Sequence, residues 1–141
     1  MDIKKLIGVF LLFTTTNITN ADTHAFKQAS EETLFRNFTL AICTGMAYEK
    51  ESKKIATDAG RSASGYREFS HIDLAAYEES RKLVKKWLAK DYKSKHGGQI
   101  ALMKCIDLYN SKELKNLFGK YDPCKNRDAW LDENEYKKKC H

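Results

Sequence analysis

Residues 99–121 read QIALMKCIDLYNSKELKNLFGKY and combine a helical apolar pattern with a cysteine. The apolar residues at helical spacing are Ile100, Met103, Ile106 and Tyr109, with Leu102 and Cys105 on the neighbouring rows. Because these residues cover most sides of a helix, the pattern predicts that this helix lies at the centre of the domain. Cys105 is then either a small core side chain in a reducing compartment or half of a disulfide in an exported protein.

The first 21 residues have the organisation of a secretory signal peptide. A short basic start with Lys4 and Lys5 precedes the apolar run 6–13, which is too short to cross a bilayer as a helix. Small residues end the segment at Ala21, and we place the cleavage there. The alternative is a membrane anchor or an ordinary core helix, and it is disfavoured because no amphipathic pattern continues past Thr16. We therefore expect export to the periplasm, with no stable membrane insertion after cleavage.

Residues 22–141 then form a mature chain of about the size of one compact domain. The whole chain carries a formal net charge of +6, and it stays basic once Asp2, Lys4 and Lys5 are removed with the signal. A basic balance is typical of nucleic-acid binding in the cytosol, but export argues against nucleic acid as a partner. Acidic proteins, anionic envelope polymers and a membrane surface remain as candidate partners.

All four cysteines, Cys43, Cys105, Cys124 and Cys140, lie in this mature part. An even number in an exported chain favours disulfides, and three pairings are possible. We choose Cys43 with Cys105, which lie in strong helical patterns, and Cys124 with Cys140, which bracket a polar tail. Loops of these lengths stabilise by roughly 4 and roughly 3 kcal/mol on the chain-entropy view. A zinc site is disfavoured because no CxxC or HxxxH spacing occurs, and we expect no cofactor.

The remaining patterns predict an all-α, disulfide-stapled single-domain bundle of about five helices. The helices are expected from Ser30, over 51–65 with an end near Gly65, over 74–90 after an Asp73 cap, from 99, and over 111–121 after a Ser111 cap. Small residues in the second helix should let it approach a neighbour closely. The tail 122–141 contains enough apolar residues for one short docked helix stapled by its own disulfide.

Two surface features between residues 81 and 98 are candidates for partner binding. The helix over 74–90 has a basic face that includes Lys82, Lys85 and Lys86. A charged face of this kind is also the ordinary solvated side of a helix, so the pattern alone does not choose between the two interpretations. An exposed loop follows, in which paired glycines permit positive φ. Its residues are Lys93, Ser94, Lys95, His96, Gly97 and Gly98, and we call it the 93–98 loop.

Catalytic motifs are scarce. A cysteine nucleophile with a histidine base, such as Cys43 with His71, is the only catalytic arrangement that the residue types permit. No GxSxG, glycine-rich phosphate loop or HExxH occurs. Cysteines on apolar helical faces of an exported chain are more often a structural pair than a nucleophile, so we expect no enzymatic activity.

Four ordered motifs carry a resemblance to a known family: LAICxxxAY at 40–48, ASGYREF at 63–69, AYEESRKLV at 76–84 and LMKCIDLYNSKEL at 102–114. Together they resemble the immunity proteins of type VI secretion amidase effectors, the fourth family of that kind, over about residues 38–121. The resemblance implies an all-helical periplasmic protein that binds a papain-like cysteine amidase injected by a sister cell and so protects the producer's peptidoglycan. It also implies a homodimer that pushes a loop into the amidase cleft.

Physical reasoning favours the same role with less detail. Blocking a cysteine amidase needs only an element narrow enough to enter its cleft and a rigid domain that holds this element. The 93–98 loop meets the first condition, and the basic face beside it would speed the encounter with an acidic partner. Two other classes stay open from the residues alone. They are a periplasmic inhibitor of another wall hydrolase, such as a lysozyme, and a binding module for anionic envelope polymers.

Overall fold

A computed structural model describes residues 24–140, and in this part of the chain the protein is all-helical. The α-helices are α1 (Ala25–Gln28), α2 (Glu31–Tyr48), α3 (Lys53–Glu68), α4 (Leu74–Leu88), α5 (Ala101–Tyr109), α6 (Lys112–Tyr121) and α7 (Glu133–Lys139). Two short 3-10 turns, η1 (Pro123–Lys125) and η2 (Arg127–Ala129), lie between α6 and α7. The predicted all-α class is confirmed. The expected signal peptide, residues 1–21, lies outside the described residues.

Helix α2 occupies the centre of the bundle. Its inner stripe, Leu34, Phe35, Phe38 and Ile42, is buried, and α2 packs against α3, α4, α5 and α6. The Ser30 side chain accepts a hydrogen bond from the Thr33 amide and so caps the first turn, as the sequence indicates. An 18-residue helix with a stripe of this width offers enough apolar surface for several neighbours to share.

The prediction of a central helix in residues 99–121 is wrong. Leu102, Met103 and Ile106 are 47–48 % exposed, whereas Cys105 and Leu108 are fully buried. Helix α5 therefore lies at the edge of the bundle and contributes only one narrow face to the core. The apolar periodicity was correct as a helix signal, but it could not say which neighbour covers the second face.

Helix α3 lies close against α2 because both helices carry small residues at their contact. A Cβ built on Gly45 would lie 3.3 Å from the Ala59 Cβ, and Ala59 and Ala63 are buried. The expected end of this helix near Gly65 is wrong, since α3 continues to Glu68. Gly65 lies on an open face of the helix, and burial of Ala63 and packing of the half-buried Tyr66 offset its cost of about 1 kcal/mol.

The later helices begin at the capping residues that the sequence indicates. The Asp73 carboxylate accepts from the Ala75 amide at 2.7 Å, and the Ser111 hydroxyl accepts from the Leu114 amide at 3.1 Å. Helix α4 buries Tyr77, Val84 and Trp87 against α2 and α6. None of the helices within residues 24–140 is long and apolar enough to span a bilayer.

Two disulfides join the four cysteines in the pairing chosen from the sequence. Cys43 in α2 bonds to Cys105 in α5, with Cα atoms 5.6 Å apart. Cys124 bonds to Cys140, with Cα atoms 5.5 Å apart, and closes the tail that follows α6. The first bond fixes the outer helix to the central helix, and the second shapes a separate small unit.

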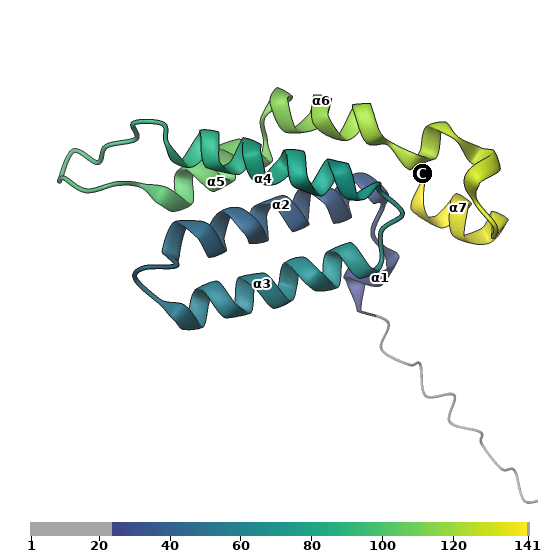
Figure 1. Cartoon of the computed structure of the whole chain (residues 1–141), viewed down its shortest axis with the longest axis horizontal. Helices are drawn as coiled ribbons and strands as arrows, with labels where there is room; N and C mark the ends of the chain where they lie inside the picture. The colour runs from purple at the N-terminus through teal and green to yellow at the C-terminus, as the bar shows by residue number, and fades with distance from the viewer. Residues whose placement is uncertain (1–23, 141) are drawn as a thin grey trace, which may run out of the picture.

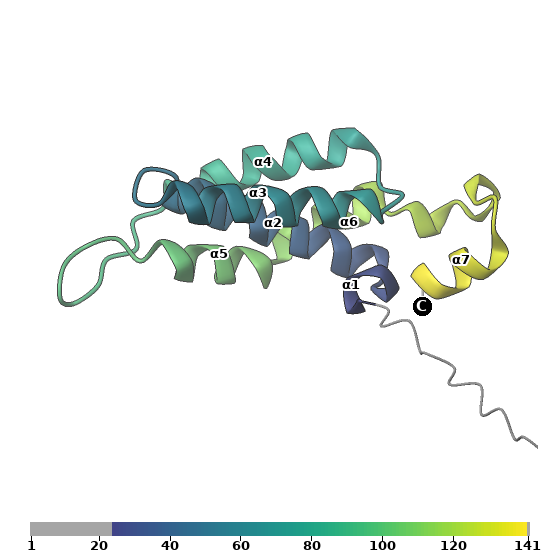
Figure 2. The same cartoon turned by 90° about the horizontal axis from the view of Figure 1, so that it is seen from below.

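The bundle is elongated, and the two features outside it lie at opposite ends (Figure 1). The 93–98 loop extends beyond the helices at the end where α4 stops and α5 starts. The unit formed by η1, η2 and α7 lies at the other end, beside α1. A view from below shows the same separation (Figure 2).

The two faces of α5 give a direct stability test. Leu108→Ala removes a fully buried side chain and should lower the free energy of unfolding by about 3 kcal/mol. Ile106→Ala, on the exposed face of the same helix, should cost about 1 kcal/mol or less. Urea unfolding of dilute protein measures both values. Equal losses of unfolding free energy in the two variants would show that both faces of α5 are buried.

Candidate functional site

The 93–98 loop is a short hairpin held by its own hydrogen bonds. Lys93 and Gln99 form an isolated antiparallel bridge at its base. The Ser94 amide donates to the Gly98 carbonyl at 3.3 Å, and the Gly97 amide donates to the Ser94 carbonyl at 3.0 Å. Gly97 and Gly98 have φ of +87° and +80°, a backbone region that side chains with a Cβ rarely adopt. The tip is therefore narrow and has a defined turn.

The base of the loop is tied to the helices on both sides. The Ile100 amide donates to the Tyr92 carbonyl at 3.3 Å. The Tyr92 hydroxyl donates to the Asp107 carboxylate at 3.0 Å, and this hydrogen bond raises the pKa of the tyrosine. These contacts connect the entry of the loop to α5, so the loop is anchored although its tip is exposed.

Lys104 is a further anchor, and it was not among the residues predicted from the sequence. Only 4 % of this lysine is exposed, and its ammonium donates to the Leu88 carbonyl and to the Gln99 side-chain oxygen, both at 2.8 Å. It therefore joins the end of α4, the exit of the loop and α5. A signal was present in the sequence, because Lys104 precedes the half-cystine Cys105 and lies one turn before Leu108.

A hollow of about 710 Å³ lies beside the base of the loop. The ends of α2 and α4 and the start of α5 form its walls, with Met46, Leu88, Gln99 and Lys104 among the lining residues. The loop thus projects next to a concave surface that has both apolar and polar walls.

The basic face of α4 is partly neutralised within the chain. Lys82 and Lys85 are exposed, but the Lys86 ammonium lies 2.9 Å from a Glu113 carboxylate oxygen on α6. The Trp87 ring N–H donates to the other oxygen of Glu113 at 2.6 Å. The hydrogen bond from Lys86 has the largest effect on the pKa of Glu113, which it lowers, and the hydrogen bond from Trp87 lowers it further. Of the three predicted lysines, Lys82 and Lys85 are therefore the better candidates for steering a partner.

The structure separates the one catalytic pair that the residue types permitted. Cys43 is bonded to Cys105, so it provides no thiolate. The His71 ring lies against the side chains of Glu31 and Trp130 at the other end of α2. Within residues 24–140 there is also no group of three or more metal-ligating side chains.

Comparisons with known proteins found one matching protein family and several similar solved structures. The family model described as "Type VI secretion system (T6SS), amidase immunity protein" matches residues 33–118. No curated protein sequence matches the chain. A solved structure of the Tae4/Tai4 effector–immunity system from Salmonella typhimurium is similar, with 27 % identity and a TM-score of 0.63, covering 67 % of this chain and 92 % of that chain.

Two further solved structures share the fold. One, described under type VI-secreted toxins and self-resistance proteins of Serratia marcescens, is 23 % identical with a TM-score of 0.61 and covers 68 % of this chain and 77 % of that chain. The other is the Tae4–Tai4 effector–immunity complex from Enterobacter cloacae, 24 % identical with a TM-score of 0.56, covering 62 % of this chain and 88 % of that chain. The segment after residue 118 lies outside the family match.

The role of Lys104 as an anchor can be tested without a partner. Lys104→Met keeps the length of the side chain but leaves the Leu88 carbonyl and the Gln99 side chain without their donor. Loop amides such as those of Ser94 and Ile100 should then exchange with solvent roughly tenfold faster, the effect of one lost buried hydrogen bond. Hydrogen-exchange NMR measures this, with the exposed Lys112→Met as control. Unchanged exchange in Lys104→Met would contradict the anchoring role.

Proposed function

The chain belongs to the type VI secretion amidase immunity family, and from this premise we propose that it inhibits a cognate peptidoglycan amidase by inserting the 93–98 loop into the catalytic cleft. A family of immunity proteins acts by binding and carries out no catalysis of its own. The producer cell wall is protected because the amidase that enters from a sister cell is blocked before it reaches peptidoglycan.

The observation that carries the proposal is the anchored, projecting loop. Its tip is narrow because of the positive φ of Gly97 and Gly98, and its base is fixed by Lys104 and Tyr92. An element that is ordered before binding loses little conformational entropy when it enters a cleft. The exposed His96 and Lys95 at the tip can hydrogen-bond to groups inside the cleft.

Charge supports the approach of the partner. Lys82 and Lys85 are exposed on the last two turns of α4, which lead towards the loop. Positive charges around a docking element speed association with an acidic surface and make it sensitive to salt. Lys93 contributes less, because its ammonium lies 3.0 Å from the Asp91 carboxylate.

The place of action that we propose is the periplasm. Two disulfides in 141 residues are typical of a protein that works in an oxidising compartment. Peptidoglycan, the substrate of the amidase, is also in that compartment. The signal peptide over residues 1–21 is the route that we propose, with residues 22–141 as the mature domain.

A homodimer is a further part of the proposal, and α5 offers the surface for it. Leu102, Met103 and Ile106 form an apolar patch on the outer face of this helix. The Cys43–Cys105 bond holds the opposite face against α2, so the patch is presented rigidly. A self-complementary patch of this kind suits a two-fold interface between two copies.

Loop insertion predicts that a short turn abolishes inhibition. Replacing residues 94–98 by Asn-Gly leaves Lys93 and Gln99 paired across a two-residue hairpin, so folding should be preserved. The inhibition constant against the cognate amidase, identified by pull-down from periplasm, should weaken by at least about 30-fold, the loss of one binding hot spot. Full inhibition by this folded variant would exclude insertion.

Steering by α4 predicts a different effect. Lys82→Glu together with Lys85→Glu should slow association about tenfold and reduce its salt dependence, while dissociation changes little. Lys86 is left in place because its reversal would set two carboxylates together at Glu113. Lys112→Glu with Lys115→Glu on α6 gives the same change in net charge as a control. Stopped-flow rates that are equal in the two double variants would contradict steering by α4.

If the α5 patch is the dimer interface, one negative charge placed in it should dissociate the dimer, whereas the same charge elsewhere should not. Met103→Glu should convert a dimer into a monomer, because it buries a carboxylate in the apolar patch. Leu131→Glu is the control, since Leu131 is fully exposed and lies in the segment between η2 and α7, outside the α5 patch. Sedimentation velocity at tens of micromolar measures the mass. A wild-type monomer at that concentration would remove the dimer from the proposal.

A further inference from the structure

The segment after α6 is a small unit that closes on itself. The Cys124–Cys140 bond links residues sixteen positions apart and encloses most of η1 and all of η2 and α7. The Trp130 ring N–H donates to the Pro123 carbonyl at 3.1 Å, and the Tyr136 hydroxyl donates to the Cys124 carbonyl at 3.4 Å. We call residues 122–140 the C-terminal clasp. It lies outside the family match, which ends at residue 118.

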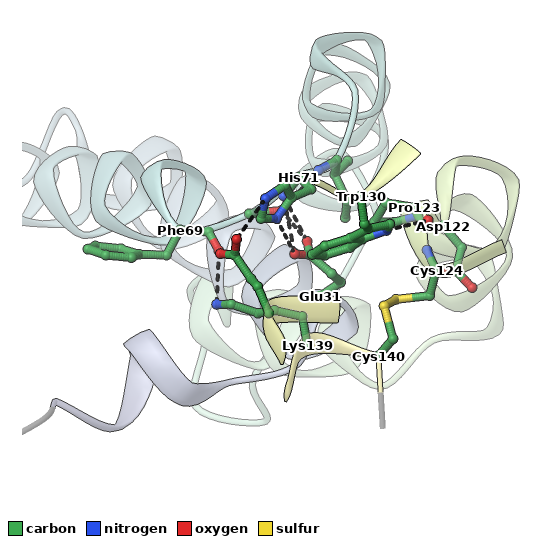
Figure 3. Close-up of polar contacts among 12 residues, drawn as sticks. Glu31, Phe69, His71, Asp122, Pro123, Cys124, Trp130, Lys139 and Cys140 are labelled. Carbon is green, nitrogen blue, oxygen red and sulfur yellow. Dashed lines mark hydrogen bonds and ion pairs between the residues drawn. A yellow bond between two sulfur atoms is a disulfide. The ribbon is translucent and has the colours of Figure 1, made fainter. Parts of the chain in front are cut away.

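One buried lysine docks the clasp onto the bundle. Lys139 is only 3 % exposed, and its ammonium donates to the Phe69 carbonyl at 3.0 Å (Figure 3). It also donates to the Lys27 carbonyl at 3.3 Å. These carbonyls belong to the end of α3 and to α1. Burial lowers the pKa of Lys139, while the charge of the nearby Glu31 acts in the opposite direction. The last turn of α7 therefore holds two separate segments of the body.

A second contact runs through His71, on the connection between α3 and α4. The His71 and Trp130 ring centroids are 4.1 Å apart, and the His71 Nε2 lies 3.7 Å from the Glu135 carboxylate of α7. On its other side the His71 Nδ1 lies 3.1 Å from Glu31, which is fully buried. The Glu31 carboxylate also accepts from the His71 amide at 3.1 Å. The clasp thus covers a carboxylate at the start of α2.

The two disulfides differ in their access to solvent. Cys43 and Cys105 are fully buried between α2 and α5, whereas Cys124 and Cys140 are each partly exposed. Thiol–disulfide exchange requires a thiolate to reach a sulfur atom, so access controls the rate. A dithiol in solution can therefore reach the outer bond, Cys124–Cys140, directly. It reaches the inner bond, Cys43–Cys105, only after the core has opened.

We propose that the Cys124–Cys140 bond is a thiol–disulfide exchange site for dithiol reductants, and that its opening releases the clasp while the bundle stays folded. A thiolate of the dithiol attacks one sulfur, a mixed disulfide forms, and the other cysteine leaves as a thiolate. The second thiol of the reductant then displaces the first cysteine. Two electrons and two protons pass to the protein, which gains two thiols, and the dithiol becomes a disulfide.

Release follows from the small size of the clasp. Helix α7 has seven residues, fewer than an isolated helix needs to be stable in water. With the bond intact, the contacts of Lys139 and Trp130 form within a closed loop. With the bond open, the undocked segment has more conformational freedom. The same contacts must then offset a larger loss of chain entropy, so the docked state is less stable. Lys139 then returns to solvent and uncovers the carbonyls of Lys27 and Phe69.

The first experiment treats the wild-type protein with dithiothreitol under native conditions. Aliquots are alkylated and digested, and mass spectrometry follows each cysteine. Cys124 and Cys140 should become alkylated at least about 100-fold faster than Cys43 and Cys105. Hydrogen exchange of the half-reduced protein should increase at residues 25–28 and at the His71 amide, and stay unchanged in α2.

Two results would overturn the proposal. Equal opening rates for both disulfides would show that access does not separate them. Opening of the outer bond without faster exchange at residues 25–28 and His71 would show that the clasp stays docked. Both readings come from the wild-type chain, so neither depends on whether a variant folds.

A matched pair of lysine variants tests the docking contact itself. Lys139→Met, with both disulfides intact, removes the donor to the Phe69 and Lys27 carbonyls and should raise exchange at residues 25–28. Lys138→Met changes an exposed neighbour on the same helix and should leave exchange as in the wild type. Equal exchange in the two variants would contradict docking through Lys139.

Discussion

The bond between Cys43 and Cys105 is the constraint on which the arrangement of the molecule depends. It fixes α5, an edge helix with only one narrow buried face, to the central helix α2. Lys104 is the residue before Cys105, so the same bond holds the ammonium that closes the base of the 93–98 loop. The disulfide in the core therefore also helps to hold the exposed loop, because Lys104 in α5 bonds to both sides of the base of the loop. The loop can be exposed and polar because its support is buried.

Local sequence signals predicted the elements well and their placement less well. The caps at Ser30, Asp73 and Ser111 depend on side chains that bond to amides two or three residues away, so they can be inferred from the sequence. The exposure of Met103 depends on which neighbour covers α5, and no local pattern contains this information. Gly65 was misjudged for a related reason, because tertiary packing offset its weak helix propensity.

In the candidate site, too, the sequence predicted the local features and missed the contacts between distant residues. The 93–98 loop was visible in the sequence because paired glycines and charges interrupt an apolar pattern. The pairing of Lys86 with Glu113 was not, since these residues lie 27 positions apart on different helices. Lys104 and Lys139 were also missed as anchors, because a lysine is usually exposed and its burial is decided by distant carbonyl groups. The charges in the sequence therefore led to an overestimate of the free basic surface. They did not reveal the buried hydrogen bonds of Lys104 and Lys139.

The contact between Lys139 and the Lys27 carbonyl has a consequence for the order in which the fold is completed. The two residues are 112 positions apart in the sequence, so this contact joins the two ends of the described part of the chain. The contacts among helices α2 to α5 and the Cys43–Cys105 bond do not involve Lys139, so they can form before α7 docks. The carbonyls at the end of α3 must meanwhile be hydrated by water. The bundle can therefore form without the carboxy-terminal helix, and the groove between α1 and the end of α3 closes only when Lys139 docks.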